Sequence, residues 1–167
     1  KLGKNGEKLI SDGDGVFVRG NCGVLGGVKY GTSLSAVYAA YENKKDFRLY
    51  VGETYPSMTG KRLAAYELEK NGLPFELITD SDAALLMSDG RINKVFIDVY
   101  VTEKGGICSE PGSLILAAAC KSFGVPLWGV LPSFAYCENK QKCDIINLKL
   151  FESVITGSGK PIKQQEG

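Results

Sequence analysis

The residue types in this chain limit the chemistry that it could carry out. Histidine is absent from all 167 residues, so a Ser-His-Asp triad, a Cys-His pair or a histidine metal site cannot be built from this chain alone. Acid-base chemistry would depend on Asp, Glu, Lys, Tyr or Cys. Asp98 stands out because it lies within the otherwise apolar run KVFIDVYV. A carboxylate in such a run either lies near the end of a strand, where it can act on a ligand, or is paired for structural reasons.

A glycine-rich stretch follows the first apolar run of the chain. Five glycines lie between residues 20 and 31, just before a helix that is expected to begin near Thr32. Such a loop lets backbone amides approach a phosphate at the start of a helix. The alternative is that the glycines only allow a tight turn between a strand and a helix. Without a Walker lysine, both interpretations stay open.

The cysteines indicate reduced thiols rather than a disulfide framework. Five cysteines are present, an odd number without the spacing of a metal site: Cys22, Cys108, Cys120, Cys137 and Cys143. Cys120 lies in the apolar run AAACKSF and is predicted to belong to the core face of a helix. Cys137 and Cys143 flank a polar loop, where a zinc pair is the less favoured alternative. We predict no metal and no cofactor.

The elements that would position these residues alternate between strands and helices. Residues 47–81 give the clearest case, because an extended run, an amphipathic helix, a Gly-Pro break and a second extended run follow one another as one β-α-β unit. Gly72 is predicted to end the helix, and Asp80 and Ser81 offer side-chain oxygens to cap the next one. In parallel sheets, ligands bind at the carboxyl ends of the strands. The loops at 52–59 and 79–82 are therefore candidate sites.

The whole chain continues this alternation and predicts the fold class. Five apolar runs are expected to be strands, at residues 16–18, 47–51, 75–78, 94–101 and 125–132. Helical patterns separate them, so we predict an α/β fold: a three-layer α-β-α sandwich around a mainly parallel, Rossmann-like sheet. We expect one domain over residues 1–150 and a carboxyl-terminal tail over 151–167, with poor order at its polar end.

Composition excludes some classes of partner. Twenty basic and nineteen acidic residues leave a net charge of +1, which gives no reason to expect nucleic acid or an anionic membrane as a partner. No apolar run approaches the roughly 20 residues needed to cross a bilayer, and the first residues lack the apolar core of a signal peptide. A cytoplasmic or organelle-matrix location is therefore expected.

Several motifs resemble one known family over nearly the whole chain. The resemblance rests on KYGTSLSAVYAA, VGETYPSMTGKRLAAYEL, LITDSDAALLM, GSLILAAACK, VPLWGVLP and FESVITGSGKPI. The family is that of the 5-methylthioribose-1-phosphate isomerases, which also includes ribose-1,5-bisphosphate isomerases and regulatory subunits of the translation initiation factor two-B complex. Only the family's carboxyl-terminal domain is matched. The resemblance implies a Rossmann-like fold, pairing of subunits through this domain, and an aldose-ketose isomerisation of methylthioribose 1-phosphate in methionine salvage.

The resemblance fails at the positions that carry the family's chemistry. The isomerases use a cysteine in a His-Cys-Asn motif after the first strand and an aspartate in a Gly-Ala-Asp motif after the fourth. Alignment puts Arg19 at the histidine position, Gly20 at the cysteine position, and either Tyr100 or Val99 at the aspartate position. Neither catalytic group is therefore retained in place.

Two cationic positions of the family are also lost. The family's Asn-Lys pair falls on Ser109 and Glu110, and the arginine of its ETRP motif falls on Tyr55. The lysine is thus replaced by an anion. Glu110 would repel a phosphate in a poorly solvated pocket by a few kcal/mol at an effective dielectric constant near 20.

The residues that could bind a substrate also have structural explanations. If a sugar phosphate binds, the candidate residues are Gly23, Thr32, Glu53, Thr59 and Ser109. Among the retained positions, Pro56 and Gly60 can be explained by turn geometry, and Asp80 and Thr32 by helix capping. A retained scaffold with altered chemistry is what a non-catalytic relative would show.

Three functional hypotheses follow. The leading one is a catalytically silent relative that acts as a structural or regulatory subunit, either as a homodimer or with another protein. The first alternative is an active isomerase that uses Cys22 and Asp98 in a shifted site. Cys22 lies two residues after the family's cysteine position, and Asp98 lies two residues before the aspartate position. At roughly 3.3 Å per residue, these two displacements run in opposite directions along parallel strands and separate the pair. A misplacement of about 1 Å can cost about a hundredfold in rate. The second alternative is a translation-factor-like module that binds a nucleotide or a sugar phosphate.

Overall fold

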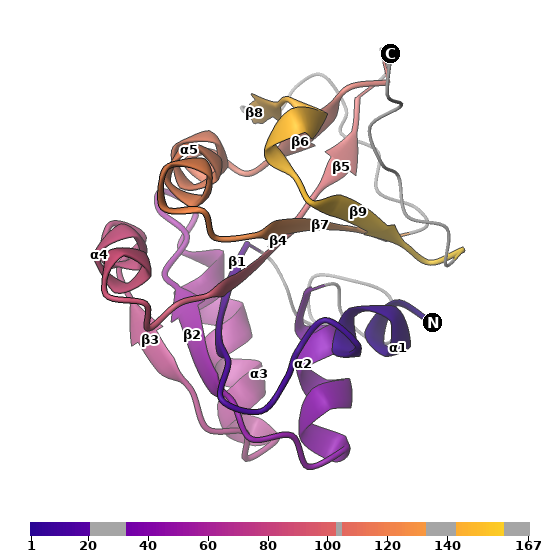
Figure 1. The fold of residues 1–167 in the computed structure, drawn as a ribbon, viewed down its shortest axis with the longest axis vertical. Helices are drawn as coiled ribbons and strands as arrows, with labels where there is room; N and C mark the ends of the chain where they lie inside the picture. The colour runs from indigo at the N-terminus through magenta and orange to yellow at the C-terminus, as the bar shows by residue number, and fades with distance from the viewer. Residues whose placement is uncertain (21–32, 103–104, 133–142, 159–167) are drawn as a thin grey trace.

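The computed structural model describes residues 1–20, 33–102, 105–132 and 143–158 (Figure 1). Over these ranges the chain alternates between short strands and helices that surround a central sheet. No helix within them combines the length and the apolar character that crossing a bilayer would require.

The central sheet contains six parallel strands in the order β3-β2-β1-β4-β7-β9. These strands are β1 (Gly15–Arg19), β2 (Arg48–Gly52), β3 (Glu76–Ile78), β4 (Lys94–Asp98), β7 (Leu127–Leu131) and β9 (Ser153–Thr156). β1 and β4 lie in the middle and are buried over nearly their whole length, as expected for a sheet that is covered on both faces. The five predicted strands correspond, to within a few residues, to β1, β2, β3, β4 and β7.

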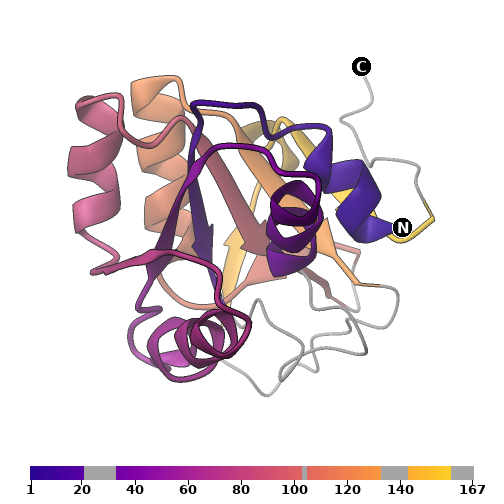
Figure 2. The ribbon, with the colours of Figure 1, turned by 90° about the horizontal axis from the view of Figure 1, so that it is seen from below.

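Helices cover both faces of this sheet and make three layers (Figure 2). One face carries α4 (Asp82–Ser88) and α5 (Ser113–Phe123), whose apolar residues join one core cluster. The other face carries α1 (Leu2–Glu7), α2 (Ser33–Glu42) and α3 (Ala65–Lys70), with a π-helical turn η1 (Gly60–Ala64) leading into α3. The chain is therefore the predicted three-layer α/β sandwich.

A small antiparallel sheet was not predicted. It contains β5 (Tyr100–Val101), β6 (Ile107–Ser109) and β8 (Asp144–Ile146), and the 3-10 turn η2 (Leu148–Leu150) follows it. The run at 94–101, which we expected to form one strand, is therefore divided into two. Its first half pairs within the parallel sheet, and its last two residues pair with β6.

Part of the range that we expected to be a tail, from residue 151, belongs to the central sheet. Ser153–Thr156 form β9, the edge strand of the central sheet, in register with β7. Val154 and Ile155 are buried there, so the domain extends past residue 150. A four-residue strand is too short for its alternation to be told from a polar loop. The final residues, 159–167, lie outside the described residues.

The structure confirms that Cys120 belongs to the core, and this sets its reactivity. The side chain is 1% exposed, and burial raises the pKa of its thiol to about 12. Because the thiolate is the reactive form, Cys120 in the folded chain should react with iodoacetamide near pH 8 at least roughly a thousandfold more slowly than in the unfolded chain. Peptide mapping by mass spectrometry, with and without guanidinium, measures this ratio. Equal labelling under the two conditions would contradict it.

Candidate functional site

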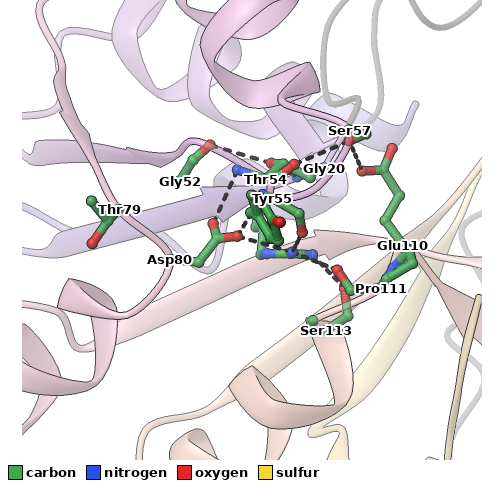
Figure 3. Close-up of polar contacts among 12 residues, drawn as sticks. Gly20, Gly52, Thr54, Tyr55, Ser57, Thr79, Asp80, Glu110, Pro111 and Ser113 are labelled. Atoms are coloured by element: carbon green, nitrogen blue, oxygen red, sulfur yellow. Dashed lines mark hydrogen bonds and ion pairs between the residues drawn. The ribbon is translucent and has the colours of Figure 1, made fainter.

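A buried arginine lies at the carboxyl ends of the central strands. Arg19 is the last residue of β1, and its side chain is 1% exposed. Its Nη2 lies 3.0 Å from Asp80 Oδ2, and it also donates to the carbonyl oxygens of Tyr55 at 3.1 Å and Pro111 at 2.6 Å. Its Nη1 donates to Ser113 Oγ at 2.9 Å. One guanidinium therefore joins the loops that follow β2 and β3 to the start of α5, and Figure 3 shows its four partners converging.

Asp80 is the counter-ion of this arginine and not a helix cap. Besides the ion pair, its carboxylate accepts hydrogen bonds from the amides of Thr54 at 3.0 Å and Tyr55 at 2.8 Å. The prediction that Asp80 caps the next helix is therefore wrong. In its place, Thr79 Oγ1 accepts a hydrogen bond from the Asp82 amide at 3.3 Å. A buried guanidinium needs a counter-ion more than an exposed helix end needs a cap, which explains the difference.

The loop between β2 and η1 has a fixed and unusual backbone. Thr54 and Met58 have φ values of 63° and 57°, in a region that residues other than glycine seldom adopt. Thr54 is fully buried, and its hydroxyl accepts from the Gly20 amide at 3.1 Å. At Gly60, a Cβ would lie 1.8 Å from the Gly52 carbonyl oxygen, so a side chain cannot fit without a backbone shift. Gly60 begins η1, so this close approach of two backbone segments, and not the predicted turn geometry, explains the glycine.

Glu110 holds the far end of the same loop. Its Oε2 accepts hydrogen bonds from Ser57 Oγ at 3.0 Å and Thr59 Oγ1 at 3.1 Å (Figure 3). The side chain that we expect at the position of the family's lysine is thus turned toward the loop. Tyr55, which we expect at the position of the family's arginine, is 68% exposed. The two side chains present a carboxylate and a phenol at this edge of the site.

Asp98 ends β4 and caps a helix that lies far from it in the sequence. It is 2% exposed, and its Oδ1 accepts from the amide of Ser33 at 2.9 Å and from the Ser33 hydroxyl at 2.6 Å. Its backbone oxygen accepts from Ser109 Oγ at 2.7 Å. A Cβ at Gly20 would lie 3.6 Å from Asp98 Cβ, so the chain that leaves β1 passes directly beside this aspartate.

Asp144 caps the start of α5, as Asp98 caps the start of α2. One of its carboxylate oxygens, Oδ2, accepts from the amides of Gly112 and Leu114, both at 2.8 Å. These are amides at the start of α5, where the helix leaves donors without an intrahelical acceptor. Because Asp144 lies at the start of β8, the small antiparallel sheet supplies the cap. The start of each of these two helices is therefore bonded to a carboxylate from another part of the chain.

The predicted substrate-binding residues are spread over this region. Glu53 is partly exposed at the start of the β2–η1 loop, Thr59 contacts Glu110, and Ser109 is 2% exposed, with its hydroxyl 3.0 Å from that of Ser113. Three other predicted residues, Cys22, Gly23 and Thr32, lie outside the described residues, so the pairing of Cys22 with Asp98 stays a prediction. In the described part of the chain, no three Cys, Asp or Glu side chains are grouped closely enough to hold a metal ion.

Sequence reasoning missed the role of Arg19. The residue was considered only as the replacement of a histidine in an aligned motif. A signal was nevertheless present, because a basic side chain at the end of the buried run VFVR requires an acidic partner. What the sequence could not supply was the identity of that partner.

Comparison with known proteins shows the family of this chain. The family model of the initiation factor 2 subunit family matches residues 1–165. A methylthioribose-1-phosphate isomerase from Petrotoga mobilis is 39% identical over 133 residues, which are 79% of this chain. The delta subunit of translation initiation factor eIF-2B from A. fulgidus has a TM-score of 0.84 at 25% identity, over 95% of this chain and 56% of that one.

A more distant structure shows the fold alone. The tetrameric eIF2B-beta2-delta2 complex from C. thermophilum contains a chain with a TM-score of 0.70 at 17% identity, over 97% of this chain and 54% of that one. The curated relatives are longer: this chain spans 38% to 53% of the length of the first three. The match nevertheless runs over nearly all of this chain. The chain therefore belongs to the initiation factor 2 subunit family.

Proposed function

We propose that this chain is a non-catalytic member of the family that acts as a structural or regulatory subunit of a protein assembly. The observation that carries the proposal is that the chain's own carboxylates fill the places at the strand ends that suit an anionic ligand. The described residues show three such places, and each is occupied by an aspartate.

Two of these places are helix starts. The amides at the start of a helix and the helix dipole attract anions, which is why phosphates bind there in many α/β proteins. Asp98 accepts the Ser33 amide at the start of α2, and Asp144 accepts two amides at the start of α5. A phosphate that bound to these amides would have to displace a carboxylate that is already hydrogen-bonded.

The third place is the Arg19 guanidinium together with two loop amides. A fixed cation next to amides that point the same way is well suited to bind a phosphate or a carboxylate. Asp80 accepts from Arg19 and from the amides of Thr54 and Tyr55. The cation is therefore neutralised within the chain.

Glu110 adds repulsion at the edge of the site. At an effective dielectric constant of about 20, two like charges 4 Å apart repel by about 4 kcal/mol. Glu110 faces the hydroxyls of Ser57 and Thr59, so a phosphate bound to those hydroxyls would meet this carboxylate. These contacts support a site that keeps its scaffold and does not bind sugar phosphates.

A role in assembly is supported by two related structures, one of a complex and one of a named subunit. The C. thermophilum chains were solved as a tetrameric complex of two kinds of subunit, and the A. fulgidus protein is itself named as a subunit. We therefore propose that this chain pairs with a protein partner, either a second copy of itself or a different chain.

Incubation with methylthioribose 1-phosphate tests the proposal. We expect no ketose product above the protein-free rate by NMR, while the Petrotoga mobilis isomerase converts the same substrate and serves as the positive control. Gly20 lies close to Asp98 and comes two residues before Cys22 in the sequence, and this placement favours an active isomerase as the alternative. Turnover that Cys22→Ala abolishes would establish that alternative and overturn the proposal.

Calorimetry tests the other alternative, a binding module. Titration with ribose 5-phosphate, methylthioribose 1-phosphate and adenosine monophosphate should give no saturable heat, because the anion-binding groups are already paired. Saturable binding without turnover would replace the structural role with that of a sensor of phosphorylated ligands.

A further inference from the structure

A cavity of about 250 Å³ lies at the amino ends of two neighbouring strands, β7 and β9. It is bounded by the last turn of α5, the α5–β7 loop and the segment that leads from η2 into β9, which are adjacent in the fold (Figure 1). Arg19 and Asp98 end β1 and β4, so the cavity is at the opposite edge of the sheet from the candidate site. Its volume is just below the range of about 300–1,000 Å³ that is usual for drug-sized ligands, so it suits a smaller molecule.

The less exposed residues that line the cavity are apolar. Leu127 and Phe151 are buried. Val125, Pro126 and Leu150 are half-buried beside them. Small-molecule sites usually combine such apolar walls with a few polar groups that fix the orientation of the ligand. The walls of this cavity therefore suit the apolar part of a ligand, and the polar groups must come from the exposed lining residues.

The exposed lining residues include both signs of charge. Lys121 lies in the last turn of α5, Lys149 lies in η2, and Glu152 comes directly before β9. Among the residues that the structure describes, none of these three forms an ion pair. The end of α5 adds acceptors and a partial negative charge, because a helix leaves its last carbonyl oxygens without an intrahelical donor. The rim of the cavity therefore offers donors to an anionic group and acceptors to a cationic one.

We propose that this cavity binds a free α-amino acid with an apolar side chain. The ammonium groups of Lys121 and Lys149 donate to the carboxylate of the ligand, and the Glu152 carboxylate and the end of α5 accept from its ammonium group. The apolar side chain packs against Val125 and Leu150. A simple carboxylate would leave Glu152 facing an anion, and a simple amine would leave two lysines facing a cation, so the rim selects a ligand that carries both charges. The inference goes beyond the proposed structural role, because it gives the subunit a ligand of its own.

Calorimetric titration with leucine and two of its analogues tests the charge pattern. We expect leucine to bind saturably, with a dissociation constant below about 1 mM; phenylalanine is titrated as a larger probe. Isocaproate lacks the ammonium group and isopentylamine lacks the carboxylate, so each should bind at least about tenfold more weakly than leucine, because each loses hydrogen bonds between charged groups. Equal binding of leucine and its two analogues would overturn the proposal. The absence of saturable heat with both amino acids up to about 10 mM would also overturn it.

Charge variants locate the binding at this cavity. Replacing both lysines, Lys121→Ala with Lys149→Ala, should weaken leucine and isocaproate by at least about tenfold but not isopentylamine, whereas Glu152→Gln should weaken leucine but not isocaproate. Lys4→Ala is the matched control: Lys4 is exposed on α1, on the other face of the sheet, and its replacement should leave leucine binding unchanged.

All four replaced side chains are exposed, so the variants should fold, and circular dichroism checks this. Leucine binding that the double lysine variant leaves unchanged would contradict a site at this cavity. None of these results changes the turnover assay, because the cavity and the candidate site lie at opposite edges of the sheet. The non-catalytic proposal therefore stands or falls separately.

Discussion

Replacing Arg19 with methionine is expected to lower the free energy of unfolding by about 3 kcal/mol. Removing one partner of a buried ion pair typically costs about 3–5 kcal/mol, because the remaining charge stays in a poorly solvated site. The Asp80 side chain is 23% exposed, so water can reach part of it, and the lower end of the range applies. The loss also leaves the Pro111 carbonyl oxygen and Ser113 Oγ without their arginine donor.

Urea denaturation of matched variants measures this effect. Arg48→Met is the control, because Arg48 is exposed on β2 and its replacement should change the unfolding free energy by less than about 0.5 kcal/mol. Arg19→Lys should fall between the two, since an ammonium keeps the charge but cannot bond in both directions as the planar guanidinium does. If Arg19→Met were as stable as Arg48→Met, Arg19 would not be the residue that joins the loops of this site.

Most of the helices and strands could be predicted from short-range sequence patterns, because the periodicity of apolar residues largely determines where these elements form. The β-α-β unit at 47–81 was correctly placed, since its helix has periodic apolar positions and ends at Lys70, two residues before Gly72, which adopts a φ of 66°. The strands β6, β8 and β9 have only three or four residues each and carry too little alternation to be distinguished from loops. β6 pairs locally with β5, but the pairing of β8 with β6 and of β9 with β7 joins segments that are far apart in the sequence, which the sequence pattern does not encode.

The candidate site was harder to predict for the same reason. The need for a glycine at position 60 is local, between its own Cβ position and the Gly52 carbonyl oxygen, although Gly60 begins η1 and does not lie in a turn. The ion pair between Arg19 and Asp80 joins residues 61 positions apart, and the cap from Asp98 to Ser33 joins residues 65 positions apart. The sequence pointed to the two loops that meet at Arg19, but the choice of partner among several acids depended on the register of the folded sheet.

Replacing Asp80 with alanine is expected to destabilise the chain by about 2–4 kcal/mol and to make it respond specifically to formate. The change leaves the Arg19 guanidinium and the amides of Thr54 and Tyr55 around a space of carboxylate size. Formate carries the missing group and should bind there. A ligand that binds only the folded state at ten times its dissociation constant adds about 1.4 kcal/mol of stability. Thermal and urea unfolding in formate, compared with chloride at equal ionic strength, measures this gain.

Two comparisons show whether formate acts at this position. The wild-type chain should gain nothing beyond the chloride effect, because Asp80 already fills the space. Asp80→Leu should be destabilised but not rescued, because its side chain occupies the same volume without a charge. Equal gains in all three chains would indicate a general salt effect and would contradict an anion-binding space at Asp80. A gain confined to Asp80→Ala would mean that the strand ends can still hold an anion, and that the chain's own aspartate excludes a ligand from this place.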